Sequence, residues 1–404
     1  MLNLLWASFF IISFVVALFS GRPDVWNVLS GALFSSAKTA FEISLNLTGI
    51  LCLWLGLLKI AESSGLTSVL SKALMPLFKK IMPDVPSDSP AFGSIVMNMA
   101  ANFLGLDNAA TPMGLKAMEQ LQSINPTPER ASPAQVLFMV INSSAVTLIP
   151  ITILMYRAEL GSTNPSAVFI PILFATSVST LVGFLSVAVV QRLNIFNRVV
   201  LGYLLFFVGV IAGAAWYFLS LPETERYQAS SALSNALLFG IVTFFIAWGL
   251  VKRLNVYETF IAGAKEGFSV AVRIIPYLVA MLVGIAVFRA SGAMDYIING
   301  LANACGALGL NTDFVPAMPT ALLKPLSGSG ARAMMIETMQ TYGADSFAGF
   351  VSCIVQGSTE TTFYVLAVYF GSVKITKTGA ALPCALLADA AGIIAAVYFG
   401  YLFY

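Results

Sequence analysis

Long runs of apolar residues recur along the whole chain and are separated by short polar segments. The longest runs cover residues 4–19, 43–58, 167–190, 199–219, 232–251, 274–288 and 382–404. A helix rises about 1.5 Å per residue, so about 20 residues cross the roughly 30 Å hydrocarbon core of a bilayer. One buried helix of a soluble protein explains one such run but not the whole series. The pattern therefore predicts an all-α, polytopic membrane protein.

The composition agrees with this class and narrows the function. Of 404 residues, 58% are hydrophobic and only 10% are charged, against about 25% charged in a typical soluble domain. The chain has no histidine, so the commonest metal ligand and general base is missing. Its four cysteines lack metal-site spacing, and the net charge of +2 comes without a basic cluster. We therefore do not expect the protein to be an enzyme. We also expect it to bind no metal, no cofactor and no nucleic acid.

Two stretches of the chain carry the same features in the same order, which indicates an internal repeat. Each has a long apolar helix, a milder helix, two polar segments rich in small residues, and a last apolar span. We predict repeats over residues 38–192 and 260–404, with an inserted helical pair over 193–259. Residues 1–37 form a first helix and a loop. That helix lacks a basic leader and a cleavage site, so we expect it to be retained.

The charges of the connecting segments predict that the second repeat is inverted. We expect residues 134–156 and 346–370 to cross the membrane once each, while the hairpins 91–123 and 318–340 re-enter without crossing. This gives about nine crossings, with a cytoplasmic N-terminus and an external C-terminus. Most lysines and arginines then lie inside, as the positive-inside tendency requires.

One pair of matching connectors tests this orientation more sharply. Residues 66–82 include Lys72, Lys79 and Lys80, whereas the matching residues 293–317 contain no lysine. A parallel repeat would place both connectors on the same side and leave the difference unexplained.

Polar breaks interrupt the hydrophobic segments at matching positions, over residues 105–112, 142–147, 324–330 and 356–362. Such breaks at membrane depth are tolerated only inside protein or beside water, and paired breaks indicate the binding site of inverted-repeat transporters. Hydroxyl and amide side chains can donate hydrogen bonds to a solute and accept them from it, and lysine or arginine side chains can bind an anionic group of the solute. The candidate solute ligands are Asn108, Thr111, Asn142, Ser143, Ser144, Lys324, Ser327, Ser329, Arg332, Gln356, Ser358 and Thr359. Small and hydroxyl residues also mediate helix packing in membranes, which is the alternative interpretation.

Ionisable residues within these segments are costly unless paired or wetted. We predict that Glu360 or Asp389 carries a coupling proton, and Asp107 is a further candidate for ion coupling. Sodium coupling through backbone carbonyls and the oxygens of Asn, Ser and Thr side chains is equally open. The alternative is an ion pair, Lys324 with Glu360 or Arg332 with Asp389, that simply fixes the second hairpin.

The same residues carry a resemblance to a known family. The stretches are Asn102–Met118, Leu323–Arg332 and Gln356–Gly371. They resemble the nucleoside recognition, or Gate, family, with the first half similar to its spore maturation A members and the second to its spore maturation B members, fused in one chain. This family is distantly similar to concentrative nucleoside transporters. The resemblance implies a bacterial inner (plasma) membrane location and a transporter-like core of re-entrant and broken helices.

Three functions follow as hypotheses. The first is a secondary transporter, importer or exporter, of a small polar solute that is anionic or zwitterionic, coupled to protons or sodium and working by alternating access. The second is a nucleoside-type transporter. The third is a non-transporting assembly or regulatory partner, which requires Lys324, Glu360 and Asp389 all to be paired internally. The apolar exterior fits lipid and a second protomer equally, so a homo-oligomer stays open.

Overall fold

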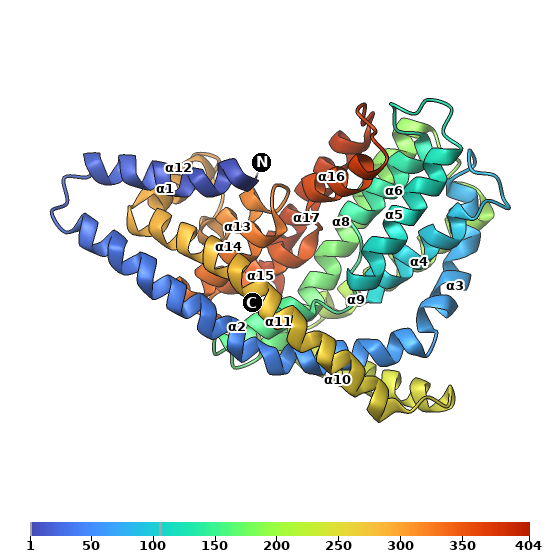
Figure 1. The fold of residues 1–404 in the computed structure, drawn as a ribbon, viewed down its shortest axis with the longest axis horizontal. Coiled ribbons are helices and arrows are strands. Elements are labelled where there is room, and N and C mark those ends of the chain that lie inside the picture. Colours follow the sequence, from blue (N-terminus) through green and yellow to red (C-terminus); the bar gives the residue numbers. More distant parts are fainter. Residues whose placement is uncertain (1, 105–106) are drawn as a thin grey trace.

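Helices build almost the whole chain in the computed structural model (Figure 1), which describes residues 2–104 and 107–404, with side chains for 4–104 and 110–404. In chain order they are α1 (Leu2–Phe19), α2 (Val25–Ser63), α3 (Leu66–Ile81), α4 (Ala91–Leu104), α5 (Asp107–Ser123), α6 (Pro133–Ser143), α7 (Ile151–Glu159), η1 (Pro165–Val168), α8 (Phe169–Gln191), α9 (Arg198–Ser220), α10 (Glu223–Val251), α11 (Val256–Ala290), α12 (Ala293–Ala307), η2 (Val315–Ala317), α13 (Met318–Leu323), α14 (Gly328–Tyr342), α15 (Phe347–Ser358), α16 (Thr362–Ser372) and α17 (Ala381–Phe403).

Within the described residues, six of these helices are long and apolar enough to cross a membrane: α2, η1 with α8, α9, α10, α11 and α17. The segments 134–156 and 346–370, predicted as single crossings, are each two short helices, α6 with α7 and α15 with α16. The prediction of an all-α, polytopic membrane protein is confirmed. The number of nine crossings and the sidedness of the termini stay predictions.

Helices α2 to α8 have counterparts in α11 to α17, in the same order. The long helices α2 and α11 are each followed by a short connector helix, α3 or α12. Both connectors begin directly after a left-handed glycine, Gly65 with φ 73° and Gly292 with φ 87°. A side chain is strained in this conformation, so glycine suits both corners.

The matching long helices α2 and α11 pack side by side and run antiparallel (Figure 1). Gly263 lies against Leu55, and Gly267, one turn later, lies against Cys52. Because a glycine lacks Cβ, the two backbones approach closely, as is common between membrane helices.

Helices α8 and α17 also match and also run antiparallel. Gly183 of α8 lies against Ala388, while Gly392 of α17 lies against Ser179. The Ser179 hydroxyl donates to the Ala388 carbonyl at 3.0 Å. Counterpart helices that run in opposite directions are what an inverted repeat requires.

The second half of each broken helix packs into the opposite half of the protein. Helix α16 contacts α5 and α6, where Tyr369 and Phe370 join a buried cluster with Phe138. Helix α7 contacts α15, where Tyr156 joins the other buried cluster with Phe350. The two repeats are therefore interlocked through α7 and α16.

Candidate functional site

The two helix breaks meet where the broken helices cross. The backbone N–H of Glu360, in the α15–α16 break, donates to the carbonyl of Ser143, the last residue of α6, at 2.8 Å. The broken ends of helices leave N–H and C=O groups without intrahelical partners, and lipid offers no replacement. The two breaks therefore satisfy one another at this crossing.

Each break is also held by the hairpin of its own half. The N–H of Leu148 donates to the carbonyl of Phe103 at 2.8 Å. In the second half, the N–H of Phe363 donates to the carbonyl of Pro325 at 3.0 Å. These equivalent contacts place both hairpins against the crossing point.

An asparagine and tyrosine network occupies the first half of this site. The Asn142 side-chain oxygen accepts from Asn102 at 2.8 Å and from Tyr369 at 3.3 Å. Asn98 donates to the Tyr369 hydroxyl at 3.2 Å, and that hydroxyl lies so close to Gly114 that a Cβ there would clash. Sequence reasoning predicted Asn142 but missed Asn98, Asn102 and Tyr369. Two asparagines one helical turn apart in an apolar helix were the available signal.

Three predicted serines use their hydroxyls within their own helices. Ser143 and Ser144 both donate to the Val140 carbonyl at 2.9 Å, and Ser358 donates to Val355 at 2.8 Å. Such local bonds are typical of packed serines in helices.

The other first-half candidates belong to α5. Thr111 is half-buried on α5. The side chains of Asp107 and Asn108 lie outside the described residues, so their predicted roles stay predictions.

The second hairpin turns at Ser327, whose hydroxyl caps α14 by accepting from the N–H of Gly330 at 3.0 Å. The Ser329 hydroxyl lies 3.2 Å from it. Gly328 lies against the hydroxyl of Thr361, which brings the start of α14 directly to the α15–α16 break.

The two predicted cations lie on either side of this turn. Lys324 follows α13 and is buried. Arg332, on α14, lies beside the hydroxyl of Tyr156, which α7 contributes from the first half. The alternative pairing of Arg332 with Asp389 is wrong, since neither carboxylate oxygen has a hydrogen-bond partner among the described residues.

The two acidic candidates of the second half differ in environment. Asp389 on α17 is only 2% exposed, whereas Glu360 is exposed at the crossing point. Gln356 and Thr359 are buried close to the same break. The structure thus brings the second-half candidates together, while their roles as ligands stay predictions.

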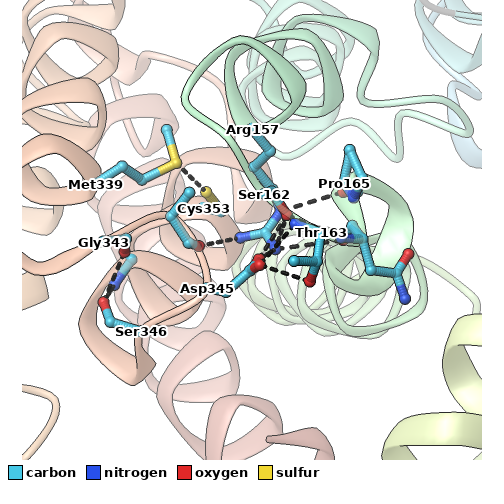
Figure 2. Close-up of polar contacts among 12 residues, drawn as sticks. Arg157, Ser162, Thr163, Pro165, Met339, Gly343, Asp345, Ser346 and Cys353 are labelled. Atoms are coloured by element: carbon cyan, nitrogen blue, oxygen red, sulfur yellow. Dashed lines mark hydrogen bonds and ion pairs between the residues drawn. The ribbon is translucent and has the colours of Figure 1, made fainter.

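A buried arginine joins the two halves at one end of the broken helices (Figure 2). Arg157, at the end of α7, is 1% exposed and donates to the Ala344 carbonyl at 2.7 Å and to the Asp345 carboxylate at 2.8 Å. It also donates to the Pro165 carbonyl and to the Ser162 hydroxyl. Both acceptors at positions 344 and 345 lie in the α14–α15 loop, so the contact connects α7 to the second half.

The surroundings of the Asp345 carboxylate favour its ionised form. Burial favours the neutral acid, but hydrogen bonds from Ser162 and Thr163 and the charge of Arg157 outweigh it and hold the pKa of Asp345 below its ordinary value. The ion pair therefore persists at neutral pH.

The opposite end of the broken helices has an equivalent but weaker contact. The Lys377 N–H donates to the Glu129 carbonyl at 2.9 Å, and the Lys377 carbonyl accepts from Ala131 at 3.0 Å. The side chains of Lys377 and Glu129 are exposed and 4.0 Å apart. A cavity of about 660 Å³ lies beside this contact, lined in part by Arg130 and Gly379. One end is thus held by a buried arginine paired with a partly exposed carboxylate, and the other mainly by backbone hydrogen bonds.

Paired broken helices, hairpins that reach their crossing point and an inverted repeat define a membrane protein with a transporter-like core. Comparison with known proteins identifies the group. The chain matches the family described as nucleoside recognition (Gate) over residues 44–163 and 271–376, which is more than half of its length, and it belongs to that family. Both stretches fall within the predicted repeats, whose exact ends stay predictions.

Two relatives from Bacillus subtilis (strain 168) are similar to parts of the chain. Spore maturation protein B is 46% identical over 165 residues, which are 41% of this chain and 91% of that protein. Spore maturation protein A is 42% identical over 179 residues, 44% of this chain and 90% of that protein. The predicted resemblance to these families is confirmed.

Proposed function

We propose that the protein is a secondary transporter of a small polar solute, anionic or zwitterionic, across the bacterial inner membrane. The observation that carries this proposal is the meeting of two helix breaks at the Glu360–Ser143 hydrogen bond, with polar side chains of both halves gathered around it. Alternating access then moves one interlocked unit against the other around this point.

The charges of the site support transport over a purely structural role. A non-transporting assembly partner requires Lys324, Glu360 and Asp389 to be paired internally. Glu360 is instead exposed, and the Asp389 carboxylate accepts no hydrogen bond from the described residues. Unpaired charge at this depth is costly and marks a functional position.

The chemistry of the solute follows from the cations beside the breaks. Lys324 and Arg332 flank the turn into α14 and suit a carboxylate or phosphate group. A nucleoside-type solute is the second candidate, because the family description names nucleoside recognition. We also propose that transport is coupled to protons or sodium, and that the N-terminus is cytoplasmic and the C-terminus external. A homo-oligomer is compatible with this proposal.

Ligand-dependent thermal stabilisation of the detergent-purified protein tests this function. The panel contains nucleosides, amino acids, dipeptides and dicarboxylates. A ligand that binds only the native state adds about 2.7 kcal/mol of stability at a hundredfold excess over its Kd. We expect an anionic or zwitterionic compound to raise the Tm of the wild-type protein, and Lys324→Ala to abolish that shift.

A control variant separates binding from folding. Lys116→Ala removes an exposed lysine of α5 and is expected to keep the full shift. A neutral nucleoside that stabilises the protein as well as its anionic relatives contradicts the assigned solute class. Stabilisation that survives in Lys324→Ala contradicts the assigned site.

A further inference from the structure

The two halves of the site differ at one equivalent position on their last helices. Gly183 of α8 faces Ser144, and Gly392 of α17 faces Thr359, so these glycines mark the same place in each half. Thr180 lies three residues before Gly183, and Asp389 lies three residues before Gly392. A neutral hydroxyl of the first half is therefore replaced by a carboxylate in the second.

The Thr180 hydroxyl makes a hydrogen bond, whereas the Asp389 carboxylate makes none with the described residues. Thr180 donates to the Ser144 carbonyl, which lies just beyond the end of α6. Asp389 adds a negative charge and brings no donor. Neither of its oxygens has a hydrogen-bond partner within the described part of the chain. An unsatisfied, buried carboxylate is strongly unfavourable unless a cation or a proton compensates it.

Further oxygens without partners surround this carboxylate. The hydroxyls of Thr359 and Thr362 lie beside it, yet their geometry gives no hydrogen bond with it or with any other described residue. The side-chain oxygen of Gln356, in the last turn of α15, is likewise buried without a partner among described residues. The carboxylate and the two hydroxyls thus lie together at the break and on α16 and α17, and Gln356 lies one turn before Thr359 at the end of α15.

The size and charge of the group that fits are limited by these surroundings. The oxygens are buried even from water-sized molecules, so an organic ammonium group has no room beside them. A single carboxylate among neutral oxygens suits a monovalent ion better than Ca²⁺ or Mg²⁺, which favour several carboxylates or retained waters.

The electrostatics of the site favour a cation as well. The carboxyl end of α15 carries partial negative charge and lies at the break. Half-helix carboxyl ends and unwound segments coordinate sodium in transporters built from broken helices. Two charged groups act on Asp389 from neighbouring elements: Lys324 attracts it, and Glu360 repels it with a smaller effect.

We infer that Asp389, Thr359, Thr362 and Gln356 form a binding site for one dehydrated sodium ion. The inference rests on the proposed function, because it identifies the coupling ion of that transporter. Sodium at this site joins α17 to the α15–α16 break and so sets the geometry of the crossing point.

Sodium-specific stabilisation in the absence of solute tests the site. NaCl is titrated against KCl at constant ionic strength and at two pH values, and the Tm of the purified protein is followed. We expect the wild-type Tm to rise with sodium and to saturate, and bound ²²Na⁺ to reach one ion per chain. Asp389→Thr, which copies the first-half residue, is expected to lose both signals while remaining folded.

Two further variants keep the result interpretable. Asp389→Asn removes the charge with little change of shape and is expected to behave like Asp389→Thr. Asp295→Asn removes an exposed carboxylate of α12 and is expected to keep the sodium response.

A Tm that depends on pH but not on sodium overturns the inference in favour of a proton site. A sodium response that survives in both Asp389 variants overturns the assigned position. Because no solute is present, either result leaves the transport proposal standing, which the solute panel tests separately.

Discussion

Replacing Arg157 by methionine is expected to lower the free energy of unfolding by about 3 kcal/mol, the lower end of the range for breaking a buried ion pair, because the Asp345 side chain is 34% exposed. The Arg157 side chain is buried and joins five acceptors around Asp345, Ala344 and Pro165 (Figure 2). Methionine fills similar space but donates no hydrogen bond, so buried carbonyl groups lose their partner. Thermal unfolding of the detergent-purified protein measures the loss as a lower Tm.

The equivalent contact at the opposite end is the control for this prediction. Lys377→Met breaks an ion pair whose two side chains are exposed and 4.0 Å apart. Exposed pairs contribute about 0–1 kcal/mol, and the backbone hydrogen bonds to Glu129 and Ala131 remain. Equal losses in the two variants would contradict the assignment of the Arg157 contact as the stronger of the two equivalent end contacts.

Gly263→Ala is expected to destabilise the protein by about 3 kcal/mol or more, the upper part of the range for overpacked sites. A Cβ at this position meets the Leu55 carbonyl oxygen at 2.4 Å and the Gly56 Cα at 2.9 Å. Both obstacles are backbone atoms, so α2 and α11 must separate along their whole contact. Thermal unfolding and the yield of folded protein measure the effect.

The matched control is the same substitution elsewhere in the same pair of helices. A Cβ at Gly49 of α2 has no described atom within 4 Å. Alanine is favoured over glycine in a helix by about 0.5–1 kcal/mol, so Gly49→Ala is expected to be neutral or stabilising. A stable Gly263→Ala protein would show that the α2–α11 contact is not essential to the fold.

The helical membrane class and the order of elements could be predicted because they depend on local patterns. Apolar runs of spanning length and polar breaks at matching positions are visible in the sequence alone. The Ser-Gly corners at Gly65 and Gly292 are equally local, since each reflects the backbone conformation of one residue.

The interlocking of the halves could not be predicted, because it depends on contacts between residues far apart in the chain. Nothing around Tyr369 in the sequence indicates that its hydroxyl meets Asn98 and Asn142. Nothing around Arg157 in the sequence indicates that it donates to Ala344, which lies in the other half. For Asp389 the sequence showed depth but not the lack of a partner, which depends on the orientation of the surrounding side chains.

Transport through this protein requires an aqueous path that reaches the crossing point of the two breaks. Glu360→Cys, in a protein whose four natural cysteines are replaced, places a thiol at that point. Phe206→Cys on α9 is the control, because this side chain is also exposed but lies on a helix apolar enough to span the membrane. Both are treated with a membrane-impermeant thiol reagent, applied outside intact vesicles and, in a second experiment, enclosed within them.

We expect the thiol at position 360 to react and the thiol at position 206 not to react. The reagent needs a thiolate, which forms in water and not in hydrocarbon. A thiol at position 360 that stays unreactive from both sides of the membrane, in a folded protein, would contradict the transport pathway.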